Sequence, residues 1–264
     1  MVLTNCYRPR PRNRLLAALP PDVLAELWPR LEAIQLPRRE ILYAPGEPIT
    51  AALFVETGTV SLIARLSSGD VIETGMIGYE GMVGLPILLG DSSDEFEATV
   101  QVPGTALQIG VEVLQEALKN IPAFRSLLLR YALFQHRQTA WTAACNGRHC
   151  ADQRLASRLL AAHDRAEGDT LPVTHESLST LLGLRRSGIT VTAQRFKAAG
   201  LIRCTRGCIE ITDRAGLEAT ACECYGVARQ SLHHLLGSEG GAKAFPPSQA
   251  ALASRRKVPS EPAT

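Results

Sequence analysis

The sequence lacks the residues that an enzyme on a β-rich fold would use for chemistry. Residues 34–110, where most of the expected strands lie, contain no histidine, and the six histidines are scattered at positions 136, 149, 163, 175, 233 and 234. A metal-dependent enzyme on a β-roll needs a histidine cluster among its strands. No glycine-rich phosphate loop follows an expected strand. The sequence therefore indicates that the protein is not an enzyme.

Long apolar runs are also missing. No stretch approaches the roughly 18 uninterrupted apolar residues of a membrane span. The N-terminus carries Arg8, Arg10, Arg12 and Arg14 among prolines where a signal peptide would be apolar. The seven cysteines are an odd number without a repeated spacing, which favours reduced thiols. We therefore expect a cytoplasmic protein that does not contact a membrane.

What is present is an ordinary globular composition with an uneven distribution of charge. The 264 residues are 45% hydrophobic and 20% charged, enough for two domains with a substantial core. The net charge is only +2, yet residues 1–115 hold eight arginines against fourteen acidic residues. Residues 182–214 hold seven basic and two acidic residues. An acidic first half before a basic later segment suggests a division of labour.

The first half shows the pattern of short antiparallel strands. Turn signals recur near every ten residues from residue 36 onward, at Pro45-Gly46, Thr57-Gly58, Ser68-Gly69-Asp70 and Gly75. This spacing predicts a sandwich or roll, with further strands through residues 83–89 and 99–109. Two helices should precede it, at residues 14–19 and 21–33, the second burying Leu24, Leu27 and Leu31.

Two helices should follow the strands, a short one from about Glu112 and a long one opened by Pro122. A helix of about 25 residues between two domains cannot bury both of its sides within one chain, so we expect it to mediate a homodimer. A central packing helix in a monomer is the alternative. The expected interface residues share one stripe: Leu127, Tyr131, Phe134, Gln138 and Trp141.

Residues 174–200 have the pattern of two short helices joined by a tight turn. Thr174 can cap the first helix, whose Leu178, Leu181 and Leu182 share a buried stripe. Gly183 suits the turn, because glycine adopts the left-handed conformation without strain. The second helix buries its apolar positions at i, i+4 and i+7, namely Ile189, Ala193 and Phe196.

The opposite face of the second helix is polar and has the chemistry of a DNA-recognition helix. Arginine can donate two parallel hydrogen bonds to guanine, and glutamine can bond adenine in a bidentate manner. A solvated helical hairpin is the simpler alternative. A basic hairpin follows, with Leu201, Ile202, Ile209 and Ile211 in its strands, and helix, turn, helix and hairpin is the order of a winged helix. The expected base contacts are Arg185, Arg186, Ser187, Thr190 and Gln194, and the expected phosphate contacts are Thr174, Lys197, Thr205 and Arg206.

The whole order predicts an α+β chain in five parts. These are a flexible basic arm at 1–13, an antiparallel β-roll sensor at 14–121, a dimerisation helix at 122–147, a winged helix-turn-helix at 148–236 and a disordered tail at 237–264. The tail prediction rests on its Gly, Ser, Ala and Pro content. This order resembles the Crp/Fnr family of bacterial transcription regulators over residues 14–236. Three motifs carry the resemblance: Gly46-Glu47-Pro48, GMVGL at 81–85, and LLGLRRSGITV at 181–191.

The resemblance implies a cyclic-nucleotide-binding-like roll, and the residues of its pocket depart from the family. Members that bind cyclic nucleotides use a glutamate for the ribose and an Arg-Ser or Arg-Thr pair further on for the cyclic phosphate. Here these positions hold Met82 and Phe96-Glu97, and an acid cannot hold an anion in place of arginine. We therefore expect a degenerate pocket without a cyclic AMP cofactor and with an unknown effector, formed by Gly81, Met82, Gly84, Leu85, Phe96 and Glu97.

The cysteines give no strong metal signal. The family's iron–sulfur members need several N-terminal cysteines, and only Cys6 lies there, so such a cluster is not expected. Cys145 and Cys150 with His149 could form a metal or redox site, although their i, i+5 spacing on helices is poor for chelation. Cys204, Cys208, Cys222 and Cys224 could form a zinc site. Ordinary thiols are the favoured interpretation of both groups, so no metal is expected.

These observations lead to one functional prediction and one alternative. The prediction is a homodimeric transcription regulator that binds double-stranded DNA at a palindromic operator and acts together with RNA polymerase. Within the recognition helix, the resemblance assigns guanine contact to Arg186, while Ser187 and Val191 replace the family's usual glutamate and arginine. The alternative is a small-molecule, redox or metal sensor whose winged helix contacts protein. Binding that is insensitive to salt would favour the alternative.

Overall fold

A six-stranded antiparallel sheet, referred to below as the roll, dominates the first half of the chain. The computed structural model describes residues 10–237. The strands are β1 (Glu32–Leu36), β2 (Ile41–Tyr43), β3 (Ala51–Arg65), β4 (Val71–Ile77), β5 (Met82–Val83) and β6 (Glu97–Gly110). The main order is β1-β6-β3-β4, with β2 beside β6 and β5 beside β3. The long β3–β6 pair shifts register near Thr57, where β-bulges bend the sheet.

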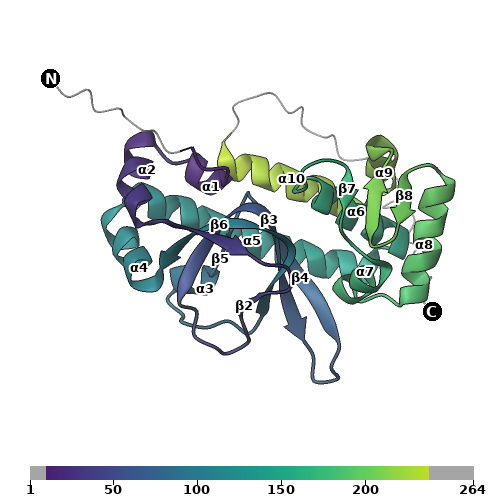
Figure 1. Cartoon of the computed structure of the whole chain (residues 1–264), viewed down its shortest axis with the longest axis horizontal. Helices are drawn as coiled ribbons and strands as arrows, with labels where there is room; N and C mark the ends of the chain where they lie inside the picture. Colours follow the sequence, from purple (N-terminus) through teal and green to yellow (C-terminus); the bar gives the residue numbers. More distant parts are fainter. Residues whose placement is uncertain (1–9, 238–264) are drawn as a thin grey trace, which may run out of the picture.

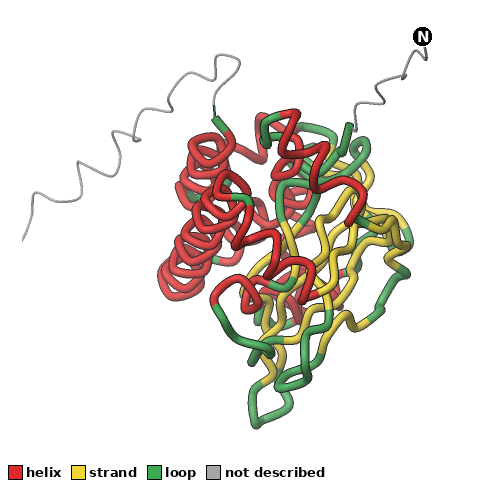
Figure 2. Tube along the Cα trace, turned by 90° about the vertical axis from the view of Figure 1, so that its left-hand side faces the viewer, coloured by secondary structure: helices red, strands yellow, loops and turns green. Residues whose placement is uncertain are grey.

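Helices cover one side of this sheet, as Figure 2 shows by colour. They are α1 (Arg14–Ala17), α2 (Pro21–Leu27), α3 (Leu85–Leu89), α4 (Val111–Asn120) and α5 (Pro122–Arg148), and a 3₁₀ turn (Trp28–Arg30) follows α2. Their apolar faces meet the sheet in one core that includes Leu15, Phe54, Phe124 and Leu128. The expected strand at 99–109 lies within β6, and the expected helix near residue 112 is α4.

Two elements differ from the sequence-based expectation. The expected strand at 83–89 is mostly α3, because Pro86 has no amide hydrogen for a strand partner while its fixed φ suits a first helical turn. The expected helix at 21–33 ends at Leu27. Pro29 has no amide hydrogen to continue the α-helical hydrogen bonds, so the chain forms the 3₁₀ turn Trp28–Arg30 and is extended from Leu31 into β1.

Asn13 belongs to the core, although the sequence suggests a flexible arm over residues 1–13. Its side chain is fully buried. Asn13 Oδ1 accepts the backbone amides of Leu15 and Leu16, and Nδ2 donates to the carbonyls of Val55 and Gly81. This residue therefore caps α1 and ties it to β3. Residues 1–9 of the expected arm lie outside the described part of the chain.

A second core belongs to a winged-helix unit, residues 151–220. Its elements are α6 (Ala151–His163), β7 (Thr170–Leu171), α7 (His175–Leu182), α8 (Arg186–Ala198), β8 (Ile202–Thr205), β9 (Cys208–Ile211) and α9 (Arg214–Thr220). Its sheet has the order β7-β9-β8, so the expected two-stranded hairpin gains a third strand. The two-residue β7 is too short to show an alternating pattern in the sequence. No helix within residues 10–237 is long and apolar enough to cross a membrane.

The last described helix, α10 (Glu223–Leu236), joins the two cores. It runs back along α5 (Figure 1), so that Tyr225 packs in the winged-helix core while Leu235 packs in the core of the roll. A single helix thus contributes to both hydrophobic clusters. Apart from Gly237, the expected disordered tail at 237–264 lies outside the described residues.

Two ion pairs with little solvent exposure hold α6 and the loop after it against the roll. Arg158 on α6 places Nε 2.7 Å from Glu73 on β4, and both side chains are less than a tenth exposed. Arg165 lies 2.7 Å from Glu80 in the β4–β5 connection. Tyr79 adds a hydrogen bond to the carbonyl oxygen of Asp164. Removing one partner of such a pair leaves an uncompensated charge in a poorly solvated site.

We predict that Arg158→Gln lowers the free energy of unfolding by about 3–5 kcal/mol, because Glu73 is left buried without its counter-charge. The double variant Glu73→Gln/Arg158→Gln should lose less than the single variant, since both charges are gone. Urea titration measures both. Arg203→Ala is the control, because the Arg203–Glu210 pair is exposed and its loss should cost less than about 1 kcal/mol. Equal losses in the single and double variants would contradict the prediction.

Candidate nucleic-acid interface

The helix-turn-helix is built as the leucine spacing predicts. Thr174 caps α7, its Oγ1 accepting the amide of Ser177 at 3.0 Å. Leu178, Leu181 and Leu182 are buried. The chain turns at Gly183 with φ +60°, in the left-handed region, and α8 then buries its inner stripe of Ile189, Ala193 and Phe196. The opposite side of α8 is therefore held outward by the packing of its inner side.

The outward side of α8 is polar and basic. Arg185, Arg186, Ser187, Gln194 and Lys197 are all exposed, as the sequence suggests. Arg186 lies 3.1 Å from Glu176 on α7, but both side chains are more than 60% exposed. An ion pair in water is worth little, so Arg186 can leave Glu176 for a stronger partner at small cost.

Two of the residues expected to contact DNA already make hydrogen bonds inside the protein. Thr190 is half-buried, and its hydroxyl donates to the carbonyl of Arg186 at 3.0 Å and lies 3.2 Å from His175 Nδ1. The Thr174 hydroxyl serves the α7 cap. Val191, by contrast, is a 52% exposed apolar side chain on the outward side of α8. Its large exposed apolar surface marks it as a further candidate for base contact.

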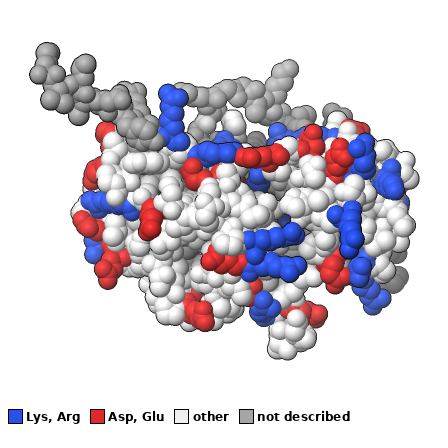
Figure 3. All heavy atoms as spheres, viewed as in Figure 1, with Lys and Arg blue, Asp and Glu red and all other residues white. Residues whose placement is uncertain are grey.

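The wing lies beside α8. Strands β8 and β9 pair from Ile202 to Ile211, and the turn between them carries Thr205, Arg206 and Gly207, all exposed. Figure 3 shows Lys and Arg side chains along the end of the molecule that carries α8 and the wing. Arg195 and Arg203 belong to this basic region but are paired with Asp152 and Glu210. The cations outside ion pairs with the described residues are therefore Arg185, Lys197 and Arg206.

The expected ligand pocket is brought together only in part. A cavity of about 490 Å³ lies between the roll, α5, α6 and α10, and Met82, Gly84, Leu85 and Phe96 are among its lining residues. Gly81 and Glu97 do not line it. Glu97 is buried, and it accepts hydrogen bonds from Arg65 and Thr99. Arg158 and Arg165 line the cavity but are paired with Glu73 and Glu80.

Tyr131 on α5 packs against the GMVGL segment at residues 81–85. A side chain at Gly81 would collide with it, because a Cβ there would lie 2.4 Å from Tyr131 Oη. The Tyr131 hydroxyl donates to the carbonyl of Met82 at 3.1 Å. Burial raises the pKa of Tyr131 above its usual range, so the hydroxyl remains a neutral donor. The GMVGL segment is thus fixed against α5 by packing and by a hydrogen bond.

The structure corrects the face of α5 that was expected to meet a partner chain. Leu127, Tyr131 and Phe134 are buried in the core beneath the roll. They are therefore unavailable to a second protomer. Gln138 is half-buried and Trp141 is 37% exposed. The chain's own roll, not a partner, covers most of this stripe of α5.

Three cysteines and a histidine that are distant in the sequence lie together in the structure. Cys145 and His149 at the end of α5 lie beside Cys222 and Cys224 at the start of α10. The group combines two residues from each of the two sets that the sequence suggests: Cys145 and His149 from the set with Cys150, and Cys222 and Cys224 from the set with Cys204 and Cys208. Cys150, Cys204 and Cys208 lie outside the group, and Cys6 is outside the described residues. Separation along the chain hid the arrangement, since Cys145 and Cys222 are 77 residues apart.

Comparisons with known proteins agree with this architecture. Residues 33–120 match the cyclic nucleotide-binding domain family, and residues 153–220 match the Crp-like helix-turn-helix domain family. A CRP-like cAMP-activated global transcriptional regulator of Mycobacterium tuberculosis is 24% identical over 217 residues, covering 80% of this chain and 97% of the relative. A global nitrogen regulator of a Nostoc species is 27% identical over 164 residues, which is 59% of this chain and 73% of the relative.

A solved structure extends the match to the fold. FixK2 from Bradyrhizobium japonicum superimposes with a TM-score of 0.64 at 18% identity, covering 73% of this chain and 98% of FixK2. The matched domains and the curated relatives together define a transcription regulator with a cyclic-nucleotide-binding-like domain and a winged helix. The chain belongs to the Crp/Fnr family of such regulators, whose members are not enzymes.

We predict opposite stability effects for alanine at two glycines of the helix-turn-helix. Gly183→Ala should destabilise by roughly 1–2 kcal/mol, because its φ is left-handed and the new Cβ would lie 3.1 Å from Ile72 Cδ1. Gly188→Ala should stabilise by about 0.5–1 kcal/mol, because this position in α8 has open space. Urea titration measures both, and a Gly183→Ala variant as stable as the parent would show that the turn is not constrained.

Proposed function

We propose that the protein is a homodimeric, sequence-specific regulator of transcription that reads a two-fold symmetric operator. The observation that carries the proposal is the exposed polar side of α8, held outward by its buried inner stripe and flanked by the basic wing. A recognition helix of this kind reaches base edges in the major groove with its N-terminal residues. The matched helix-turn-helix family and the regulatory relatives support this assignment.

The proposed DNA contacts are of two kinds: contacts to bases, which specify the sequence, and contacts to phosphates, which position the protein on the duplex. Arg185, Arg186, Ser187 and Gln194 lie along the exposed side of α8 and are proposed to meet base edges. Val191 suits the methyl group of thymine. The Thr190 hydroxyl is bonded to the backbone carbonyl of Arg186 and lies beside His175 Nδ1, and it is proposed to meet a base edge by exchanging these bonds. Lys197, Thr205 and Arg206, with Thr174 at the start of α7, are proposed phosphate contacts.

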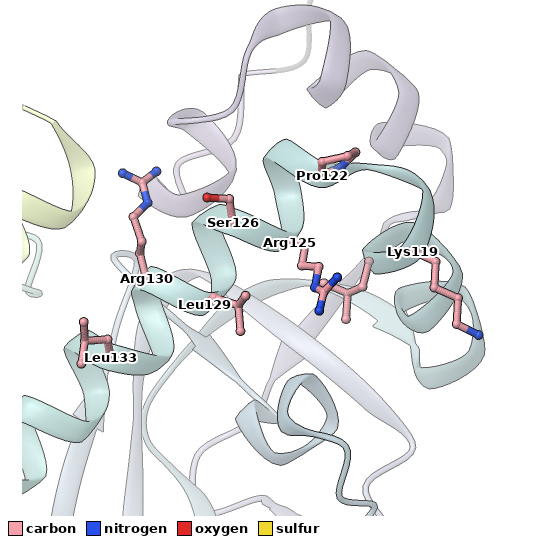
Figure 4. Close-up of a pocket in the computed structure, with 8 residues that line it drawn as sticks. Lys119, Pro122, Arg125, Ser126, Leu129, Arg130 and Leu133 are labelled. Atoms are coloured by element: carbon pink, nitrogen blue, oxygen red, sulfur yellow. The ribbon is translucent and has the colours of Figure 1, made fainter.

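The proposed dimer uses the side of α5 that faces away from the roll. Exposed residues recur there at alternating spacings of three and four, which is the seam of a two-stranded coiled coil: Ser126, Leu129, Leu133, His136, Ala140 and Ala143. Leu129 and Leu133 are 43% and 47% exposed. They border a depression of about 510 Å³ between α4 and α5 (Figure 4), rimmed by Arg125 and Arg130.

The proposed effector chemistry follows from the cavity. Arg158 and Arg165, which line it beside the roll, are paired with Glu73 and Glu80, and Phe96-Glu97 stands where the family's phosphate-binding Arg-Ser or Arg-Thr pair is expected. We therefore propose that cyclic AMP is not the effector. The protein is proposed to act in the cytoplasm, where it would meet both its operator and RNA polymerase.

Selection of bound sequences from random duplex DNA tests the proposal. The purified protein should enrich a palindrome whose half-sites lie about 34–36 Å apart, one turn of the duplex. Arg186→Ala should relax preference at one position per half-site, equivalent to about 1–3 kcal/mol, because a bidentate base contact is lost.

Lys197→Ala is the matched control for this selection. A phosphate contact on the same helix should weaken binding to all sequences evenly and leave the enriched palindrome unchanged. An Arg186→Ala variant that selects the same sequence as the parent would rule out the base contact. Failure of the parent to enrich any sequence would rule out sequence-specific reading by the isolated protein.

We predict that Leu129→Glu/Leu133→Glu converts the dimer to a monomer, because it places two like charges per chain in an apolar seam. Sedimentation equilibrium measures the mass. Leu66→Glu is the control, since Leu66 is 55% exposed in the β3–β4 turn, away from the seam. A parent protein that sediments as a monomer, or a double variant that remains a dimer, would contradict this interface.

A further inference from the structure

Four metal-binding side chains meet where α5 ends and α10 begins. Cys145, His149, Cys222 and Cys224 each offer one ligand atom, and these four atoms all lie within 4.8 Å of one another. Cys222 and Cys224 are buried, while Cys145 and His149 are half-buried. Cys145 lies in the last turn of α5, and His149 is the extended residue directly after the helix, whose amide donates to the carbonyl of Cys145 at 3.0 Å.

The distances fit a tetrahedral zinc site. Zinc binds thiolate sulfur at about 2.3 Å and imidazole nitrogen at about 2.0–2.1 Å, so tetrahedral neighbours are separated by roughly 3.8 Å for two sulfurs and 3.6 Å for sulfur and nitrogen. Cys145 Sγ lies 3.6 Å from Cys222 Sγ. Cys224 Sγ lies 3.6 Å from His149 Nδ1. The ligand atoms are thus already near the spacing that the ion requires.

Groups around the four ligands also match a metal site. The other ring nitrogen of His149, Nε2, lies 3.3 Å from the carboxylate of Glu223. A carboxylate on the free nitrogen of a ligating histidine fixes its orientation and tautomer. Ser157 Oγ lies 3.2 Å from Cys222 Sγ.

Arg154 provides the balancing charge. Its side chain is buried, and its Nε has no hydrogen-bond partner among the described residues. Cys145 and Cys222 are the groups whose charges act on it. Three thiolates and one neutral imidazole around Zn²⁺ leave one negative charge. That charge would compensate the guanidinium, whose burial is otherwise costly.

We propose that Cys145, His149, Cys222 and Cys224 bind one zinc ion in a closed structural site. Three sulfur ligands and one nitrogen ligand select zinc over magnesium or calcium, which prefer oxygen. The ion fastens the end of α5 to the start of α10, and through Arg154 Nη2, which donates to the carbonyl of Leu182, it also supports the end of α7. The site therefore ties the long helix to the helix-turn-helix.

Metal analysis of the purified full-length protein tests the proposal without any use of DNA. Elemental mass spectrometry of protein expressed with added Zn²⁺ should find about one zinc per chain, as four ligands saturate one tetrahedral ion. Cys222→Ser and His149→Gln should each leave substoichiometric zinc. Cys208→Ser, which removes a half-buried thiol on the wing outside the cluster, should retain the parent content.

Cobalt provides a second measurement on the parent protein. Replacing Zn²⁺ by Co²⁺ should give the visible bands and the sulfur-to-metal charge-transfer absorption of a tetrahedral thiolate site, and both should be lost in His149→Gln. A parent protein that retains neither zinc nor cobalt would overturn the proposal. So would an intact mass that shows a Cys145–Cys222 disulfide, iron with acid-labile sulfide in place of zinc, or zinc loss in Cys208→Ser as large as in Cys222→Ser.

Discussion

The long helix α5 can bury only one side within its own chain, and the rest of the molecule is arranged around that limit. Phe124, Leu127, Leu128, Tyr131 and Phe134 pack beneath the roll and fix the sheet to the helix. The opposite side leaves Leu129 and Leu133 exposed to solvent. This exposure is unfavourable in a monomer, and a dimer formed along this side would bury both side chains. The far end of the same helix carries Cys145 and His149 to the winged-helix unit. One helix thus connects the roll, the proposed dimer interface and the proposed DNA-binding surface.

The placement of the winged helix depends on polar contacts as much as on packing. The pairs Glu73–Arg158 and Glu80–Arg165 join it to the roll through side chains with little solvent exposure. Loss of one partner from either pair therefore leaves an uncompensated charge and lowers the free energy of unfolding. Helix α10 adds apolar contacts to both cores. Contacts of this kind favour a small number of discrete arrangements over continuous flexing. A ligand in the cavity beside Glu73 would act on these same contacts.

The sequence predicted the elements whose apolar spacing is compatible with only one type of secondary structure. The stripes of α7 and α8 could be recognised because Leu178, Leu182, Ile189 and Phe196 recur at helical spacing around a single turn glycine. The sequence did not predict which element packs against an apolar stripe. The apolar spacing on α5 fits packing against a partner helix and packing against the chain's own sheet equally well. Nor could it assemble the Cys145–Cys222 group, because proximity across 77 residues is set by tertiary packing that no local pattern encodes. Asn13 was missed for the same reason, since its four hydrogen bonds depend partly on β3 and on Gly81.

The salt dependence of binding to duplex DNA tests the central claim, that α8 and the wing contact nucleic acid. Each phosphate that a lysine or arginine neutralises releases counterions, so the logarithm of the association constant should fall linearly with the logarithm of salt concentration. Three or four cations in each protomer give six to eight phosphate contacts per dimer, which predicts a slope of roughly −5 to −7. The slope should become shallower when Arg206 and Lys197 are replaced by alanine. A parent protein whose binding is weak and insensitive to salt would contradict the account and would assign the winged helix to a protein partner.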